Sequence, residues 1–172
     1  GADFWTFPST GHVIRYLAGG MFRRGLWVSK SDGEGWVEDV QFNPHYALRL
    51  HKTLPRPRWD GSAGGKLINY QREHLEGMVF GRCQREHMRG NFLYAAFDGI
   101  AFRDDDGGTQ ARVFLHGTDT GSRAATLEKT ASGGVDFINA QLVPLGTWAQ
   151  AGIVTTPSFS GVARLFNTQA WA

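Results

Sequence analysis

The stretch Asn43–His51, NPHYALRLH, alternates apolar and polar residues, a pattern typical of a strand with one buried face. If its apolar residues point inward, His45, Arg49 and His51 form an outward row. Such a row suits an acidic sugar, because an arginine pairs with its carboxylate through two hydrogen bonds. A neutral histidine can then remove the α-proton, which is on the carbon that bears the carboxylate. The row predicts a catalytic site for β-elimination. The alternative is a solvated polar face without chemistry.

The segment Lys52–Lys66, KTLPRPRWDGSAGGK, predicts a loop insertion after this strand, because prolines stiffen its first half and glycines loosen its second. It carries Arg56, Arg58 and Trp59. An exposed indole ring packs against sugar C–H groups, and guanidinium groups hold carboxylate or sulfate. The loop is therefore a candidate substrate-binding element. The alternative is that its tryptophan covers an open flank of the fold.

The tetrapeptide QREH occurs twice, at Gln71–His74 and at Gln84–His87, and two Glu-His pairs this close suggest a metal or acid–base site. The surrounding residues argue against a shared site. KLINYQREHLEG predicts a short helix with Gly77 as its C-cap, whereas the second copy ends a strand-like GMVFGRC. Even in one unbroken helix, Glu73 and Glu86 would lie on nearly opposite faces. We interpret the duplication as coincidence.

The acidic run Asp104–Asp106 precedes two glycines, Gly107 and Gly108. It lacks the alternating acids of an EF-hand and the pattern of the calcium-binding nonapeptide, so we interpret it as a hydrated turn. Calcium at this turn is the alternative. We otherwise expect no cofactor and no metal.

The composition restricts the classes of protein to which the chain can belong. It has 172 residues, 41% of them apolar, which is enough for one domain over residues 1–172. Lys and Arg number 18 against 16 Asp and Glu, so nucleic acid is not indicated as a partner. No apolar run approaches the roughly 20 residues that span a bilayer, and the first residues lack the features of a signal peptide. We expect no membrane partner. A single cysteine, Cys83, excludes an internal disulfide.

The 23 glycines are interleaved with short runs rich in Val, Ile, Leu and the 12 phenylalanines, which indicates many short strands separated by turns. Four segments align on a glutamine: GWVEDVQFN, GMVFGRCQRE, GVDFINAQLV and GVARLFNTQAW, with Gln41, Gln84, Gln141 and Gln169. These glutamines are 43, 57 and 28 residues apart, which fits a solenoid of some two dozen residues per coil. Because the repeats lack an amphipathic helix, a parallel β-helix is favoured.

A polar residue stands two positions before each of these glutamines: Asp39, Arg82, Asn139 and Asn167. An asparagine at the same corner of successive coils tolerates left-handed φ and can hydrogen-bond the backbone of the corner next to it. We predict that Asn139 and Asn167 are stacked corners with a structural role.

With GEGWVEDVQFNP, GVDFINAQLV and IVTTPSFSGVARLFNTQAW, residues 11–172 resemble the right-handed parallel β-helix proteins of the pectate lyase superfamily type. The resemblance rests on scaffold motifs. It implies an extracellular or cell-surface protein acting on polysaccharides as a lyase, a glycoside hydrolase or a phage tailspike depolymerase. The aspartate cluster and Gly-His-Gly element of polygalacturonases and the arginine-containing pattern of classical pectate lyases are absent, so no catalytic residue is carried over.

The last segment, ARLFNTQAWA, is expected to stop in the middle of a coil without a cap. Uncovered solenoid ends expose strand edges and apolar core, which pair readily with other chains. We therefore expect a continuation of the solenoid or a second subunit to cover this end.

Together these features predict an all-β fold, a right-handed parallel β-helix with one short helical or loop insertion. The protein is expected to cleave or bind a polysaccharide, with an acidic polysaccharide preferred. The predicted catalytic residues, for β-elimination, are His45, Arg49 and His51. The predicted substrate-binding residues are Arg56, Arg58, Trp59, Arg82 and Arg85. The alternative is a non-catalytic structural or glycan-binding β-helix, such as a tailspike or adhesin segment. A plain β-domain with a misread repeat is a third interpretation.

Overall fold

The structure, a computed structural model, describes residues 4–5, 9–48 and 63–171. Over these residues the chain winds into a parallel β-helix of six coils, and each coil adds a strand to each of three parallel sheets. None of the described helices is long and apolar enough to cross a membrane.

The three sheets are named A, B and C in the order in which each coil visits them. Sheet A contains β1 (Phe4–Trp5), β4 (Arg24–Val28), β7 (Glu76–Phe80), β10 (Asp98–Phe102), the first half of β13 (Arg123–Ile138) and β15 (Ala151–Ser160). Sheet B contains β2 (Ser9–Arg15), β5 (Ser31–Glu38), β8 (Cys83–Arg89), β11 (Thr109–Phe114), the second half of β13 and β16 (Ala163–Phe166). Sheet C contains β3 (Ala18–Gly19), β6 (Gln41–Phe42), β9 (Phe92–Tyr94), β12 (Gly117–Gly121), β14 (Gln141–Pro144) and β17 (Gln169–Ala170).

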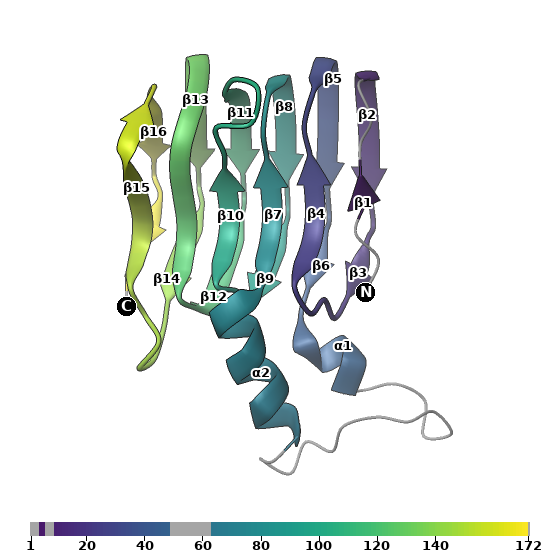
Figure 1. The fold of residues 1–172 in the computed structure, drawn as a ribbon, viewed down its shortest axis with the longest axis vertical. Helices are drawn as coiled ribbons and strands as arrows, with labels where there is room; N and C mark the ends of the chain where they lie inside the picture. The colour runs from purple at the N-terminus through teal and green to yellow at the C-terminus, as the bar shows by residue number, and fades with distance from the viewer. Residues whose placement is uncertain (1–3, 6–8, 49–62, 172) are drawn as a thin grey trace.

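The coils have the predicted hand. In Figure 1 the strands β4, β7 and β10 run upward in front, β5, β8 and β11 run downward behind, and the chain advances from right to left. This path is a right-handed coil. The predicted period is also confirmed, because Ile100 follows its register partner Met78 by 22 residues and Ala125 follows Ile100 by 25.

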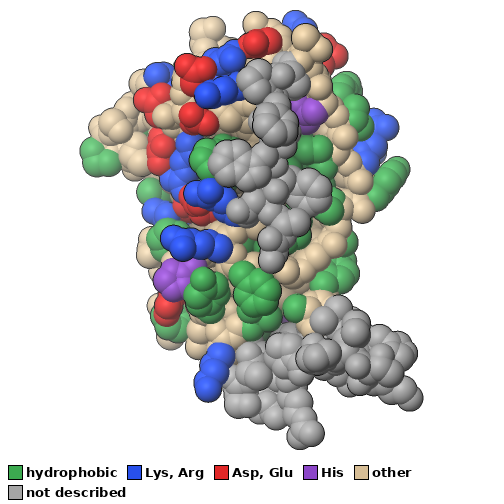
Figure 2. Space-filling view, turned by 45° about the vertical axis from the view of Figure 1, so that its right-hand side comes forward, with side chains coloured by type: hydrophobic (Ala, Val, Ile, Leu, Met, Phe, Trp, Pro, Cys, Tyr) green, Lys and Arg blue, Asp and Glu red, His purple; other side chains and the backbone are tan. Residues whose placement is uncertain are grey.

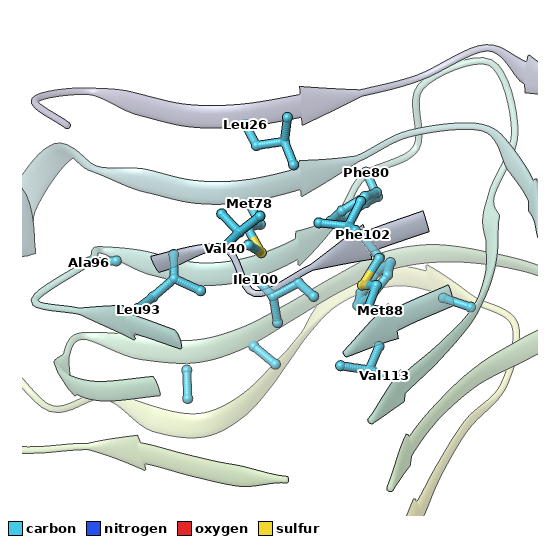
Figure 3. Packing of buried hydrophobic residues seen from close by; sticks show 14 of the residues in the cluster. Leu26, Val40, Met78, Phe80, Met88, Leu93, Ala96, Ile100, Phe102 and Val113 are labelled. Atoms are coloured by element: carbon cyan, nitrogen blue, oxygen red, sulfur yellow. The ribbon is translucent and has the colours of Figure 1, made fainter. Parts of the chain in front are cut away.

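Rows of apolar side chains, one from each coil, fill the interior. Leu26, Met78 and Ile100 stand in register in sheet A and are fully buried. Next to them, the rings of Phe80 and Phe102 stack with centroids 5.9 Å apart. Figure 3 shows these side chains stacked between the strands. Because successive side chains of a strand point to opposite faces, the intervening residues face outward, where any site must lie.

The corner between sheets B and C carries the predicted asparagine ladder. Asp39, Asn139 and Asn167 all adopt left-handed φ, at 53°, 52° and 44°. The Asn167 Nδ2 donates to the Asn139 Oδ1 at 2.8 Å. The same corner is made by Tyr16, Gly90 and Leu115 in the other coils, also at positive φ. The predicted stacking of Asn139 and Asn167 at left-handed corners is therefore confirmed, and the hydrogen bond joins the two side chains rather than a side chain and the backbone.

The alignment of one of the four segments, GMVFGRCQRE, is wrong. Gln141 pairs with Gln169 in sheet C, and Gln41 pairs there with Phe92. Gln84 instead lies in β8 of sheet B, and Arg82 lies at the corner between sheets A and B. The segment starting at Gly77 resembled the others because it also runs from a glycine through an apolar strand to a polar corner.

Replacing Asn167 with alanine is expected to lower the free energy of unfolding by about 1 kcal/mol. Alanine adopts left-handed φ less readily than asparagine, whose side chain can form a local hydrogen bond. The variant also loses the hydrogen bond to Asn139. Asn167→Gly relieves the φ but not the lost bond, so it should cost less. Urea unfolding measures both, with Gln169→Ala as an exposed control expected to stay within about 0.5 kcal/mol of the parent. An Asn167→Ala midpoint equal to that of the control would contradict a structural role for the ladder.

The predicted strand at 43–51 is wrong over its described part. Residues Pro44–Leu48 form α1, a short helix. Proline suits a first helical position, and the Asn43 Oδ1 accepts a hydrogen bond from the His45 N–H at 2.9 Å, as an N-cap does. These start signals outweigh the apolar alternation, which also suits one helical turn.

The helix predicted within KLINYQREHLEG is confirmed as α2 (Ala63–His74), which lies between the second and third coils. It begins within the expected loop insertion, so residues 63–66 are helical, while residues 52–62 lie outside the described part of the chain. Gly77 is not its C-cap but lies in β7, where an added Cβ would be 1.9 Å from the Leu93 Cδ2. The Ser122 Oγ donates to the Arg72 carbonyl at 2.8 Å, which ties the end of α2 to the coils.

The sixth coil contributes a strand to each sheet, so the predicted stop within a coil is wrong. Large apolar side chains there are exposed, with Leu165 at 51% and Trp171 at 54%. Cover by a continuation of the solenoid or by a second subunit stays a prediction.

Candidate functional site

The outer face of sheet B carries a row of aromatic and basic side chains. Trp36, His87 and Arg112 stand in register on β5, β8 and β11. The Trp36 and His87 rings stack with centroids 4.4 Å apart and planes inclined by 20°. Each of the three residues precedes a buried apolar residue, Val37, Met88 or Val113 in turn, and the alternation of the strands turns them outward.

Arginines flank this row. Arg89 and Arg112 are both exposed, and within the described residues neither guanidinium group has a hydrogen-bond or ion-pair partner. The Arg85 Nε lies 3.5 Å from the Glu34 Oε1, but both side chains are about half exposed, so water competes with this pair. The face therefore presents two guanidinium groups without a direct ion pair among the described residues, beside the carboxylates Glu34 and Glu38 that also line its hollows.

Two hollows flank the row. One, of ≈ 260 Å³, is lined by Trp36, Glu38, His87, Met88, Arg89, Arg112, Phe114 and Ile138. The other, of ≈ 160 Å³, is lined by Glu34, Arg85, Glu86, His87, Gln110, Ala111 and Arg112. His87 and Arg112 belong to both, so these two side chains form the ridge between the hollows. We call the residues of both hollows the sheet B face.

At the floor of the second hollow, a buried carboxylate contacts a histidine. The Glu86 carboxylate is 1% exposed and its Oε2 lies 3.2 Å from the His12 Nε2. Gly35 lies between them, where an added Cβ would be 2.2 Å from the Glu86 Oε1. Burial and the nearby Glu86 charge raise the pKa of the Cys83 thiol, which keeps it protonated. Because Glu86 and Cys83 are closed off from solvent, we assign this group to the scaffold.

The two QREH copies lie in different environments, as predicted. Gln71–His74 ends helix α2, where Glu73 is exposed and its Oε2 lies 3.7 Å from His74 Nε2. Gln84–His87 lies in strand β8, where Glu86 points into the core. They do not form one site.

His45, a predicted catalytic residue, lies beside sheet C. Gln41, Asn43, His45 and Tyr46 line a hollow of ≈ 300 Å³, and the His45 ring meets Tyr94 edge-on at 5.6 Å. The other predicted residues of this region, Arg49, His51, Arg56, Arg58 and Trp59, lie outside the described residues.

Arg82 and Arg85 do not share a groove with His45. In Figure 1, α1 lies below the lower ends of the strands, whereas β8 begins at the top. Arg82 is held at that upper corner by ion pairs with Asp32 and Asp106, the latter at 3.3 Å. Arg85 belongs to the sheet B face. The structure therefore does not bring these three predicted residues together.

Charges of both signs crowd together on sheet A, at the left of Figure 2. Asp98 is fully buried there, and its carboxylate meets Arg103 at 2.7 Å, Arg123 at 2.6 Å and the Thr126 hydroxyl at 2.6 Å. Arg103 also binds Glu76 at 2.7 Å and Glu128 at 2.6 Å. Because each carboxylate is matched by an arginine, this network is a structural one.

The acidic turn is tied into ion pairs. The Lys129 Nζ lies 2.9 Å from the Asp104 Oδ1, and the Arg82 Nε lies 3.3 Å from the Asp106 Oδ2. Across the described ranges, no three His, Cys, Asp or Glu side chains are grouped as metal ligands.

The sequence reasoning missed Trp36, His87, Arg89 and Arg112. The members of the aligned row share only their place within the coil, three positions before a corner: Trp36 before Asp39, His87 before Gly90 and Arg112 before Leu115. Only Asp39 among these corners is of the polar type used to find the repeat.

These features define a right-handed parallel β-helix whose sheet B face carries stacked aromatic rings and two arginines without an ion pair among the described residues. No protein-family model matches the chain, and neither the curated proteins nor the solved structures contain a match to it.

Proposed function

We propose that this protein binds an acidic polysaccharide across the sheet B face, outside the cell or at its surface. The observation that carries the proposal is the pair of unpartnered arginines, Arg89 and Arg112, beside the stacked rings of Trp36 and His87. Guanidinium groups pair with carboxylate or sulfate through two hydrogen bonds, and the indole face packs on the C–H groups of a sugar ring.

The repeat of the fold suits a repeating ligand. Parallel strands of neighbouring coils are spaced by about 4.8 Å, which is close to the length of one pyranose residue in a chain. A polysaccharide lying across the strands thus meets Trp36, His87 and Arg112 in succession, one coil after another. The strands fix the backbone of these residues and the Trp36–His87 stack restrains the two rings, so the conformational entropy lost on binding falls mainly on the arginine side chain.

The double variant Arg89→Ala and Arg112→Ala is expected to bind a polyuronate at least tenfold more weakly, which corresponds to about 1.4 kcal/mol. Titration calorimetry with a polyuronate, a sulfated polysaccharide and a neutral glucan measures this loss. The wild-type affinity for the two charged polymers should fall as salt is added.

Arg23→Ala with Lys66→Ala is the matched control, because both side chains are exposed, lie away from sheet B and change the net charge equally. It should retain affinity within about twofold, as expected for charges outside the contact surface. Equal weakening of both double variants would place the ligand elsewhere, or reduce the effect to overall charge.

Cleavage of the same polymer by β-elimination is a second candidate, favoured by the register of His87 with Arg112. Arg112 would hold the uronate carboxylate and His87 would take the proton from the carbon next to it. The C–O bond at the β carbon then breaks, a carbon–carbon double bond forms, and the departing sugar oxygen takes a proton from water.

Ultraviolet absorbance of unsaturated uronides, read alongside reducing ends, distinguishes the outcomes. A rise in both that is lost in His87→Gln supports elimination at His87, because glutamine cannot act as the base. Reducing ends alone would indicate hydrolysis by carboxylates. Binding with neither product would identify a non-catalytic glycan-binding β-helix.

A further inference from the structure

The larger hollow of the sheet B face has two chemically different walls. Arg89 and Arg112 supply guanidinium groups, whereas Phe114 and Ile138 supply apolar surface. The register explains the juxtaposition, because Phe114 of β11 pairs with Arg89 on one side and with Ile138 on the other. Positive charge and apolar surface therefore lie one strand spacing apart.

The apolar wall continues along the solenoid. Ile138 pairs with Phe166 of β16, so three successive coils place an apolar residue in the same outward position. Phe166 is 48% exposed. Outward positions of a sheet are ordinarily polar, and an apolar surface with a polar rim marks a binding surface.

A bare polyuronate would use the arginines but would lay its hydroxyl groups on this apolar row. Desolvating a hydroxyl group against an apolar surface is unfavourable unless it gains a hydrogen bond, and Phe114, Ile138 and Phe166 offer no side-chain donors or acceptors. An acyl ester removes the hydroxyl hydrogen and adds a methyl group, whose burial is favourable.

We propose that the ligand is an acidic polysaccharide whose sugars carry O-acetyl esters, with the carboxylates on Arg89 and Arg112 and the acetyl methyl groups on the row Phe114, Ile138 and Phe166. This proposal rests on the proposed function, since it specifies the polymer that the sheet B face binds. It assigns charge recognition and ester recognition to separate strands of one surface.

The test uses an O-acetylated bacterial polyuronate and the same preparation after mild alkaline de-esterification, so that chain length and charge are matched. The wild-type protein should bind the acetylated form at least fivefold more tightly, because several acetyl groups meet the row at once. Equal affinities, or tighter binding of the de-esterified form, would overturn the inference. Failure of both forms to bind would refute the proposed function itself.

The variant Phe114→Thr with Ile138→Thr should weaken binding of the acetylated polymer more than binding of the de-esterified polymer and so bring the two affinities together, because threonine keeps strand propensity without the apolar surface. Val13→Thr is the matched control. Val13 is a 62% exposed residue of the same sheet on the other side of Trp36, so its variant should keep the preference for acetylated polymer. A preference that persists in the double variant would also overturn the inference.

Discussion

Replacing Asp98 with alanine is expected to lower the free energy of unfolding by about 3 kcal/mol, because two arginines then lose the buried carboxylate between them. Arg103 and Arg123 each contact Asp98 within 2.7 Å, and the Thr126 hydroxyl donates to it at 2.6 Å. The value lies at the low end for a broken buried pair because Arg103 and Arg123 keep 21% and 19% of their side chains exposed. Urea unfolding at neutral pH measures the loss.

Asp104→Ala is the matched control for this variant. Asp104 also lies beside sheet A and pairs with Lys129, but its side chain is 57% exposed. Exposed ion pairs contribute at most about 1 kcal/mol, so the control should unfold close to the parent. If Asp98→Ala behaved like Asp104→Ala, the network around Arg103 would be a surface feature without structural weight.

The second large effect is a loss of stability in acid that arises from His116. This side chain is 1% exposed, and neither ring nitrogen has a hydrogen-bond partner among the described residues. Burial lowers the pKa of His116 from 6.5 to about 4, because removal from bulk solvent disfavours the charged imidazolium.

The sign of the pH dependence follows from that shift. Between pH 6.5 and about 4 the unfolded chain protonates this histidine while the folded chain does not. The unfolded state then binds more protons, so stability is complete above pH 6.5 and falls as the pH is lowered to about 4. The pKa difference corresponds to about 3 kcal/mol.

His116→Asn should remove this component of the acid sensitivity. The coil before it has Asn91 at the equivalent position, where its Oδ1 accepts from the Val40 N–H and its Nδ2 donates to the Val37 carbonyl, both at 2.9 Å. An amide at position 116 is placed to make the corresponding two hydrogen bonds to the backbone of its own preceding coil. Because carboxylates also titrate in this range, the measurement is the stability difference between the two proteins as a function of pH. A difference that stays constant from pH 6.5 to 4 would show that His116 does not titrate in this way.

The coil period and the corners near the C-terminus could be predicted from the sequence, because Asn139 and Asn167 are chemically the same residue in the same role. Corners made by Tyr16, Gly90 and Leu115 adopt the same left-handed φ but share no side-chain chemistry. They are held by the coils on either side, so a search for similar residues passes over them.

The helices show a different limit. The nine residues Asn43–His51 match a strand by alternation, while Asn43 and Pro44 match a helix start, and only packing decides between such short patterns. The insertion that follows also moves the next corner from Asp39 to Gly90, 51 residues on, twice the ordinary spacing. This displacement allowed Gln84 to align falsely.

The candidate site could not be predicted, because its members are brought together by register between coils rather than by spacing along the chain. Trp36 and His87 are 51 residues apart and yet their rings stack. Their partnership requires the position of each residue within its coil, which depends on corners that the sequence does not mark.

The pairing of β4 with β7 keeps Leu26 opposite Met78 although the chain leaves the stack between them to form α1 and α2. The length of that excursion is therefore uncoupled from the geometry of the coils. The segment between β6 and β7 can therefore be replaced, lengthened or shortened during evolution without changing the register of the coils. A peptide could be grafted there in the laboratory for the same reason. The excursion with α1 and α2 can therefore vary in sequence and length while the residues that pack the coils stay the same.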